Sequence, residues 1–254
     1  MNKINELFQE KKNKILSIYF TAGFPKLDDT NIILDELVKA GVDMIEVGIP
    51  FSDPLADGPV IQHSSEVALK NGMNLKLLFD QLQTANCKLP TLLMGYLNPI
   101  LQFGVENFCK QASEVGVSGV ILPDLPMDEY LKDYKSIFDK YNLKNIFLIT
   151  PQTSEKRIRT IDEHSDGFIY LVSSSSTTGV KNGIDPEKEK YFSRIKAMKL
   201  KNPLMIGFGI ADKQSFAKAC EYANGAIIGS AFIKAIENGK NLKNDISSFI
   251  KSIK

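Results

Sequence analysis

Residues 44–62 have the sequence Met-Ile-Glu-Val-Gly-Ile-Pro-Phe-Ser-Asp-Pro-Leu-Ala-Asp-Gly-Pro-Val-Ile-Gln. The apolar run at its start follows a turn signal, Ala40-Gly41, and predicts a strand with Glu46 in its middle. A carboxylate in a strand that is buried on both faces loses hydration, which costs several kcal/mol unless the group is paired or neutralised. The strand leads into a loop in which three prolines restrict the backbone and carry Asp57 at a set position.

Glu46 and Asp57 allow two interpretations from the residues alone. They form a candidate acid/base pair whose different surroundings separate their pKa values. Alternatively, Glu46 faces solvent or makes a structural ion pair, and the Asp-Pro and Asp-Gly steps are ordinary turn chemistry. The pattern leaves both interpretations open.

Composition narrows the class of protein. The chain has 254 residues, of which 43% are hydrophobic, and a net charge of +1. This length permits one large barrel or two small domains, and we predict a single domain over residues 1–254. Lysine and arginine are spread along the chain, so neither a nucleic-acid partner nor a membrane surface is indicated.

The chain ends and the cysteines suggest a location. Residues 1–8 predict an amphipathic helix with no signal-peptide features, and no apolar run approaches the ~20 residues of a membrane span. Cys87, Cys109 and Cys220 are scattered with no Cys-x-x-Cys, which favours reduced thiols over a disulfide framework or zinc site. We therefore expect a cytoplasmic protein without a bound metal, and we expect His63 and His164 to be structural or surface residues.

Strand-like and helix-like stretches alternate along the whole chain. About eight such units in this length predict a (β/α)8 TIM barrel with parallel strands, and a doubly wound open sheet is the second choice. We expect an extra N-terminal helix and an added helical segment after the second strand, over residues 61–70. The predicted strands are Ile15–Phe20, Met44–Val47, Thr91–Gly95, Gly119–Leu122, Asn145–Ile149, Gly167–Val172, Pro203–Gly207 and Gly225–Ile228.

The last two strand-to-helix turns contain glycines, in Gly207-Phe208-Gly209-Ile210 and Ile228-Gly229-Ser230-Ala231. Glycine lets a ligand approach the backbone, and a helix start attracts an anion, so the two turns together predict a phosphate site. Each turn alone is also explained by ordinary turn geometry. The Ser/Thr-rich residues 173–183 are typical of a flexible linker, or of an active-site lid if the fold is a barrel.

Residues 46–59 closely resemble the signature of tryptophan synthase alpha subunits, Glu-Leu-Gly-Ile/Val-Pro-Phe-Ser-Asp-Pro-Leu-Ala-Asp-Gly-Pro, and differ from it only at Val47. The similarity extends over nearly the whole chain and keeps its order. The further motifs are Tyr19-Phe20-Thr21-Ala22-Gly23, Tyr96-Leu97-Asn98-Pro99, Pro123-Asp124-Leu125-Pro126, Tyr170-Leu171-Val172-Ser173, Thr178-Gly179, Gly207-Phe208-Gly209-Ile210 and Gly229-Ser230.

The resemblance implies a lyase of tryptophan biosynthesis. Members of that family cleave indole-3-glycerol phosphate to indole and D-glyceraldehyde 3-phosphate by a retro-aldol reaction. They need no cofactor, and they pass indole to a beta subunit that carries pyridoxal phosphate, in an alpha2beta2 heterotetramer. Each of these properties is therefore expected of this chain.

The resemblance also implies roles for individual residues. Glu46 becomes the general acid/base and Asp57 the group that accepts from the indole N–H. Thr178 becomes a lid residue that bonds the loop carrying Asp57, and Asp53 is a candidate contact to the beta subunit. Ser176 replaces a glycine of the family's lid. The expected indole-pocket residues are Tyr19, Ile61, Tyr96, Ile121, Tyr170 and Phe208, with Tyr170 also positioning Glu46, and the expected phosphate-binding residues are Gly179, Gly209, Gly229 and Ser230.

Three other functions remain possible at this stage. The first is a free-standing indole-3-glycerol phosphate lyase, and the second is a catalytically inactive binding subunit that regulates a partner. The third is another phosphate-binding barrel of the same pathway. Retention of both Glu46 and Asp57 disfavours the inactive subunit. The loop from Pro50 to Pro59 disfavours the other barrels.

Overall fold

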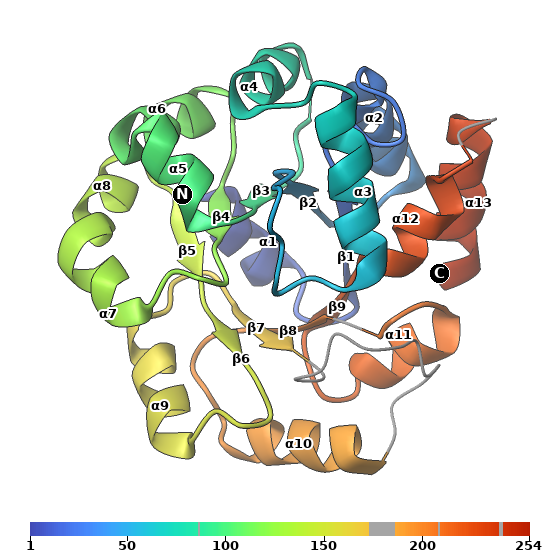
Figure 1. The fold of residues 1–254 in the computed structure, drawn as a ribbon. Coiled ribbons are helices and arrows are strands. Elements are labelled where there is room, and N and C mark those ends of the chain that lie inside the picture. Colours follow the sequence, from blue (N-terminus) through green and yellow to red (C-terminus); the bar gives the residue numbers. More distant parts are fainter. Residues whose placement is uncertain (86, 173–185, 208, 239–240) are drawn as a thin grey trace.

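A parallel sheet forms the centre of the molecule and helices surround it (Figure 1). In this computed structural model the described residues are 1–85, 87–172, 186–207, 209–238 and 241–254. The strands are β1 (Ile15–Thr21), β2 (Met44–Gly48), β3 (Thr91–Met94), β4 (Gly119–Ile121), β5 (Lys144–Ile146), β6 (Leu148–Ile149), β7 (Ile169–Val172), β8 (Leu204–Gly207) and β9 (Gly225–Ile228).

The sheet closes into a barrel. Its order is β5-β4-β3-β2-β1-β9-β8-β7-β6, with every pair parallel. The two end strands, β5 and β6, are separated in the chain only by Phe147, whose carbonyl accepts a 2.9 Å hydrogen bond from the Tyr170 backbone N–H. They are therefore two halves of one interrupted strand, and the nine segments make the predicted eight-stranded barrel.

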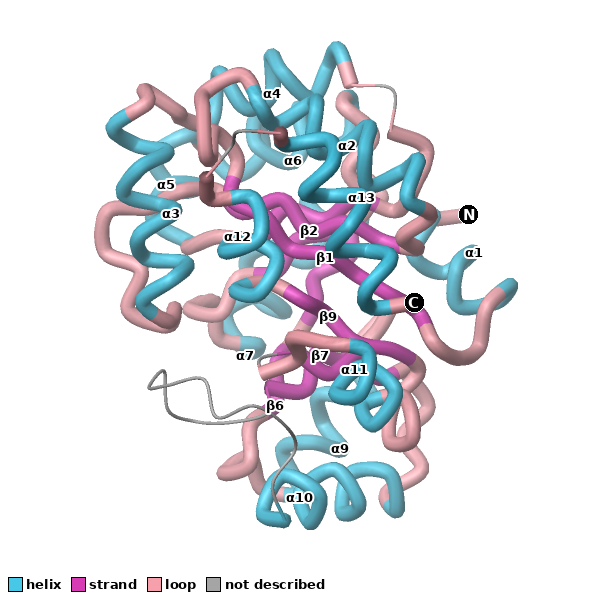
Figure 2. The backbone as a smooth tube through the Cα atoms, turned by 90° about the vertical axis from the view of Figure 1, so that its right-hand side faces the viewer, coloured by secondary structure: helices cyan, strands magenta, loops and turns pink. Residues whose placement is uncertain are grey.

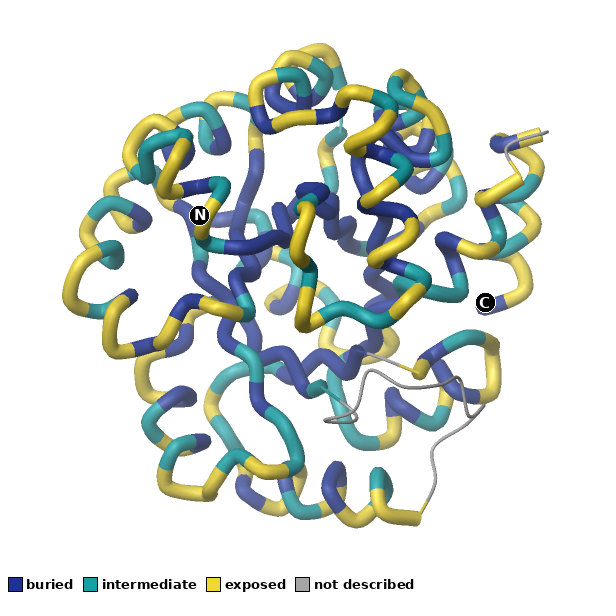
Figure 3. Tube along the Cα trace, in the orientation of Figure 1, coloured by how far each residue is buried: buried dark blue, intermediate teal, exposed yellow. Residues whose placement is uncertain are grey.

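Helices cover the outside of the barrel (Figure 2). Their bounds are α1 (Lys3–Glu10), α2 (Asp29–Ala40), α3 (Pro59–Lys70), α4 (Leu75–Thr84), α5 (Leu97–Phe103), α6 (Val105–Glu114), α7 (Met127–Glu129), the π-helix η1 (Tyr130–Tyr134), α8 (Lys135–Lys140), α9 (Glu155–His164), α10 (Pro186–Ala197), α11 (Lys213–Ala219), α12 (Ser230–Ile236) and α13 (Leu242–Ile253). Because helices cover the outer face and side chains fill the inside, all residues of β1 and β2 are buried (Figure 3).

The extra N-terminal helix, α1, is confirmed and packs against the N-terminal ends of strands. Asn2 caps it by accepting from the Ile4 N–H at 2.9 Å, and donates to the Ser118 and Asn142 carbonyls at 2.8 and 2.7 Å. Ile4 is fully buried beside Gly119 at the start of β4. This helix therefore lies at the end of the barrel opposite the loops that follow the strands.

The added helical segment after the second strand is also confirmed, since both α3 and α4 stand between β2 and β3. One local expectation is wrong: the predicted strand at residues 145–149 is broken at Phe147. The helical segment between β4 and β5 contains the π-helical turn η1. None of the described helices is long and apolar enough to cross a membrane.

Candidate active site

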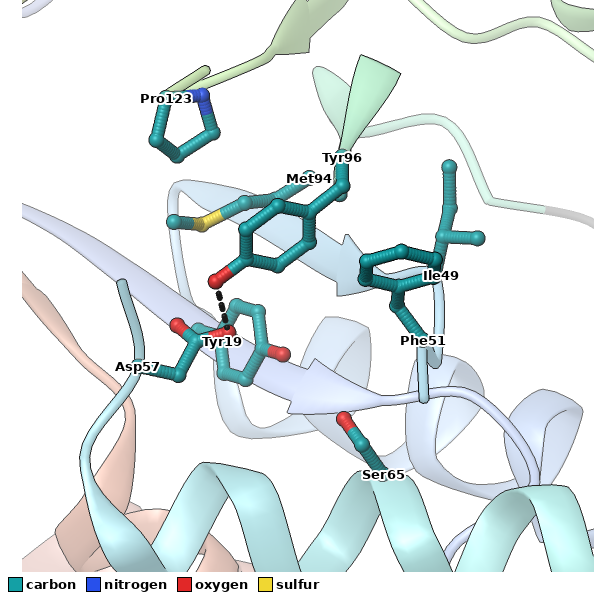
Figure 4. Close-up of a pocket in the computed structure, with 9 residues that line it drawn as sticks. Tyr19, Ile49, Phe51, Asp57, Ser65, Met94, Tyr96 and Pro123 are labelled. Atoms are coloured by element: carbon teal, nitrogen blue, oxygen red, sulfur yellow. Dashed lines mark hydrogen bonds between the residues drawn. The ribbon is translucent and has the colours of Figure 1, made fainter. Parts of the chain in front are cut away.

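A narrow hollow lies at the C-terminal ends of β1, β2 and β3, beside the loop that follows β2 (Figure 4). Its free space is about 10 Å³, roughly the room of one water molecule. It brings together three of the predicted site residues, Tyr19, Asp57 and Tyr96. The other lining residues are Ile49, Phe51, Ser65, Met94, Gly95 and Pro123.

Asp57 is held in this hollow by Tyr96. The Tyr96 hydroxyl donates to Asp57 Oδ2 at 3.0 Å and accepts from the Ala56 N–H at 3.0 Å. The Asp57 N–H donates to the Pro54 carbonyl at 3.0 Å, and the Tyr96 ring stacks on Phe51 with 5.1 Å between ring centroids. The loop is thus fixed at both backbone and side chain, as its prolines suggest.

The environment of Asp57 changes its acidity. Burial raises its pKa to about 6, and the hydrogen bond from Tyr96 acts in the opposite direction. Asp57 is therefore mainly ionised at neutral pH, and can accept a hydrogen bond from a ligand N–H.

Glu46 lies inside the barrel and does not line the hollow. It is fully buried, Oε1 accepts a 3.0 Å hydrogen bond from the Ser17 hydroxyl, and Oε2 has no hydrogen-bond partner among the described residues. Burial raises the pKa of Glu46 to about 8, against the opposing effect of the Ser17 bond. This carboxyl is therefore mainly protonated at neutral pH.

Two tyrosine rings lie over glycines of neighbouring strands. A Cβ on Gly48 of β2 would overlap the Tyr19 hydroxyl, and a Cβ on Gly207 of β8 would overlap the Tyr170 hydroxyl. Burial raises the pKa of both tyrosines well above its usual range, and the charges of Glu46 and Asp57 add to the effect. Only glycine leaves room for either ring.

The turn predicted to bind phosphate lies next to β1. Strand β9 pairs with β1 at Ile18 and Ile228, and Gly229 and Ser230 follow directly. No side chain caps the start of α12 within the described residues, and a Cβ on Gly229 would lie 3.3 Å from the Tyr19 ring. Strand β1 thus stands between the strand that carries Glu46 and the turn that contains Ser230.

The remaining predicted residues are placed as follows. Ile61 and Ile121 are buried on α3 and β4 without lining the hollow, and Tyr170 is buried on β7. Gly209 has a positive φ of 80°. Phe208, Gly179, Thr178 and Ser176 lie outside the described residues.

A second, wider cavity of about 520 Å³ lies on the outer side of the same loop. Apolar side chains from three helices, α3, α4 and α5, and from the loops that precede α3 and α4 line it, among them Ile49, Met73 and Phe103, and Lys76 lines it as well. Asp53 is exposed nearby in the chain, and Leu55 is 86% exposed.

The described residues contain no group of three or more histidine, cysteine or carboxylate side chains arranged to hold a metal. His63 is exposed on α3, with Nε2 3.7 Å from Glu237 Oε1, and His164 is exposed at the end of α9. The three cysteines are free.

Sequence reasoning missed several residues that surround the candidate carboxylates. Ser17, which bonds Glu46, had a detectable signal: Ser17, Tyr19 and Thr21 alternate along β1, so their side chains share one face. Phe51, Ser65 and Met94 line the hollow and carried no comparable signal, because apolar and small residues at such positions are common in any core.

Comparison with known proteins identifies the family of the chain. The family model described as tryptophan synthase alpha chain matches residues 5–253. A tryptophan synthase alpha chain from Flavobacterium psychrophilum is 58% identical, and one from Flavobacterium johnsoniae is 56% identical, with 100% of both chains covered in each case. A crystal structure of tryptophan synthase subunit alpha from Legionella pneumophila is 36% identical, covers 100% of this chain and 97% of its own, and superposes with a TM-score of 0.87. The chain therefore belongs to the tryptophan synthase alpha chain family.

Proposed function

We propose that the chain is a lyase that cleaves indole-3-glycerol phosphate to indole and D-glyceraldehyde 3-phosphate, as the alpha subunit of tryptophan synthase. The observation that carries this proposal is a pair of carboxyl groups in different surroundings of one barrel: Glu46 is fully buried beside Ser17, and Asp57 accepts a hydrogen bond from Tyr96 in the hollow. Burial raises the pKa of Glu46 to about 8 and that of Asp57 to about 6. At neutral pH one is mainly an acid and the other mainly a base. Separated values of this kind assign acid and base roles.

Glu46 would act first as the acid. The bond between indole C3 and the glycerol chain breaks when C3 receives a proton and the neighbouring hydroxyl loses one. A protonated Glu46 gives its proton to C3, and the carboxylate so formed takes the hydroxyl proton as the carbon–carbon bond breaks. The proton returns to Glu46, so the cycle needs no metal or cofactor for its balance.

Asp57 would stabilise the intermediate. Protonation at C3 places positive charge on the indole ring, and its N–H becomes a stronger donor. The ionised Asp57 carboxylate accepts from that N–H in a partly buried site, where electrostatic stabilisation is stronger than in bulk water. Its present partner, the Tyr96 hydroxyl, occupies Oδ2 at 3.0 Å, so substrate shares or displaces that bond.

The order of the strands suggests where the indole ring and the phosphate of the substrate would bind. The indole ring would fit against Tyr19, Tyr96 and the buried aliphatic residues behind them, with Tyr170 packed beside Glu46. The phosphate would lie at Gly209, Gly229 and Ser230, because backbone N–H groups at a helix start attract anions. The Tyr19 ring lies between these two regions, against Gly229. The proposal also includes further residues in the roles that the family resemblance implies. These are Ile61, Ile121 and Phe208 in the indole pocket, Gly179 at the phosphate and Thr178 in the lid.

A beta subunit is the proposed partner. A chain in the crystal structure of tryptophan synthase from M. tuberculosis in its aminoacrylate-bound form superposes on this one with a TM-score of 0.86 at 26% identity. The exposed Asp53 and Leu55 and the groove beside them would form the contact surface. We propose an alpha2beta2 heterotetramer with pyridoxal phosphate only in the beta subunit, and a cytoplasmic location, which suits the free cysteines.

Two alternatives share this site and are separated by one experiment. Indole release from indole-3-glycerol phosphate is measured with the purified chain alone and with a tryptophan synthase beta subunit. Weak activity that the beta subunit strongly raises supports the alpha-subunit proposal. Full turnover by the chain alone identifies a free-standing lyase, and no turnover in either condition identifies an inactive regulatory subunit.

A further inference from the structure

Glu46 and Ser17 meet in the interior of the barrel, and the register of their strands shows where. Glu46 of β2 stands opposite Tyr19 of β1, whereas Ser17 stands opposite Met44. Because Ser17 precedes Tyr19 by two residues, it lies closer to the N-terminal ends of the parallel strands. The 3.0 Å bond from Ser17 to Oε1 therefore draws the carboxyl toward the N-terminal side of its own backbone position.

The hollow with Asp57 lies in the opposite direction. Its lining includes Ile49, Gly95 and Tyr96, which follow the C-terminal ends of β2 and β3, and Glu46 does not belong to it. A carboxyl that must transfer a proton to a ligand there has to come within hydrogen-bond reach of it. In the position bonded to Ser17, Glu46 is withdrawn from the hollow.

In the withdrawn position the Glu46 carboxyl has few hydrogen-bond partners. Both side chains have no exposed surface, the Ser17 hydroxyl is the single hydrogen-bond partner of the carboxyl among the described residues, and Oε2 has none. Buried polar atoms without a partner are uncommon in proteins and carry a cost. The carboxyl therefore has to break only one hydrogen bond to leave this position.

We propose that Ser17 is a positioning residue for Glu46: the Ser17 hydroxyl holds the Glu46 carboxyl in a withdrawn position until substrate binds beside Asp57. This inference rests on the proposed function and adds to it a resting state of the acid/base. Ser17 does not touch the substrate in this account. Its effect on the reaction comes through the position and acidity of Glu46.

The groups around Glu46 determine how its acidity responds to loss of the bond. Tyr19 on β1 and Tyr170 on β7 are neutral at ordinary pH, since burial raises their pKa, and Asp57 lies on the loop beyond β2. Strand β3 places the apolar Leu92 opposite Glu46. The Ser17 hydrogen bond favours the ionised form of Glu46. Among the described residues, no cation would stabilise that form if the bond were lost. Loss of the hydroxyl raises the pKa of Glu46 further.

The test compares Ser17→Ala with Ser17→Thr, which keeps a hydroxyl, in the full chain with a beta subunit present. Ser165→Ala is the matched control, because Ser165 is also buried and its hydroxyl bonds the Ile161 carbonyl on α9, outside the barrel. Three quantities are measured: kcat for indole release, the pH dependence of kcat/KM, and the pKa of the Glu46 carboxyl by ¹³C NMR. Ser17→Cys replaces Ser17→Ala if the alanine variant does not fold.

The expected result for Ser17→Ala is a higher kcat, by a factor of about two to ten on the scale of one net hydrogen bond. The NMR pKa of Glu46 and the alkaline limb of kcat/KM both move to higher pH, while Ser17→Thr and Ser165→Ala match the unaltered chain. A lower kcat, or an unchanged Glu46 pKa, in Ser17→Ala overturns the proposal. If the unaltered chain releases no indole with or without the beta subunit, the proposed function fails, and the NMR titration alone decides whether Ser17 holds Glu46.

Discussion

The Tyr96 hydroxyl donates a 3.0 Å hydrogen bond to Asp57 Oδ2 and accepts one of 3.0 Å from the Ala56 N–H, so it joins the end of β3 to the loop that follows β2. Helix α5 begins directly after Tyr96, and the Asp124 carboxylate accepts from the Leu97 N–H at 3.0 Å. Tyr96 is thereby fixed at its backbone, and it fixes Asp57 in turn. The carboxylate proposed to accept from indole is thus positioned before substrate arrives.

Removal of this hydroxyl tests its effect on Asp57. In Tyr96→Phe the hydrogen bond that lowers the pKa of Asp57 is lost, so we expect the acid limb of kcat/KM to move to higher pH and kcat/KM to fall about threefold to tenfold. Tyr141→Phe is the control, because the Tyr141 hydroxyl donates to the exposed Glu106 away from the site. An unchanged acid limb in Tyr96→Phe shows that Tyr96 does not set the acidity of Asp57.

Asp57→Asn tests the charge itself. The amide keeps the size of the side chain but cannot stabilise a positive indole, so we expect kcat to fall by about 10²- to 10³-fold, or 3 to 4 kcal/mol, on the scale of a removed oxyanion-hole donor. Steady-state kinetics with a beta subunit measures the loss. A rate near that of the unaltered chain would assign the chemistry to Glu46 alone.

The two carboxyl groups predict a bell-shaped pH dependence. Asp57 must be ionised, so kcat/KM falls as pH drops below about 6, and Glu46 must be protonated, so it falls as pH rises above about 8. A profile of indole release from pH 5 to 10 checks both limbs, and Asp57→Asn removes the acid limb. A rate that stays constant through pH 9 is incompatible with protonated Glu46 as the acid.

The acidity of Glu46 also affects stability. Its folded pKa of about 8 lies above the ordinary value of 4.5, so the folded state disfavours the ionised form. The chain therefore loses stability as pH rises from about 4.5 through about 8. Glu46→Gln removes this dependence, and its melting temperature should exceed that of the unaltered chain at pH 8 to 9. A melting temperature that falls equally with pH in both proteins contradicts the buried, raised pKa.

A contact between strands predicts a coupled pair of substitutions. In Gly48→Ala the new methyl group overlaps the Tyr19 hydroxyl, so the ring is displaced from the hollow, KM rises and the melting temperature falls. In a chain that already carries Tyr19→Ala, Gly48→Ala should lower the melting temperature much less. A double-mutant cycle measures the coupling, and additive effects would show that the ring moves freely.

Much of the architecture followed from the residues. The alternation of strand and helix patterns predicted the barrel, the N-terminal helix and the helical segment after β2, because periodicity reports which face of each element is buried. It did not predict the break at Phe147, since Phe147 continues the apolar run Ile146-Phe147-Leu148-Ile149. Nor did it predict the π-helical turn at η1, which changes hydrogen bonding but not composition.

The site was predictable only in part. Glu46 stood out because a carboxylate in an apolar strand requires an explanation, and Asp57 because prolines fix its loop. Their different environments depend on side-chain direction and register: Glu46 bonds Ser17 inside the barrel, and Asp57 bonds Tyr96 in the hollow. These contacts join residues that are far apart in the chain, so no local pattern contains them.

The measurement that tests the central claim most directly is the single-turnover rate of indole release by Glu46→Gln in the presence of a beta subunit, together with its affinity for indole-3-glycerol phosphate. Glutamine keeps the shape of the side chain but supplies no proton. We predict folded protein that binds substrate with little change and shows no measurable cleavage. Cleavage near the rate of the unaltered chain would contradict the assignment of Glu46 as the acid/base.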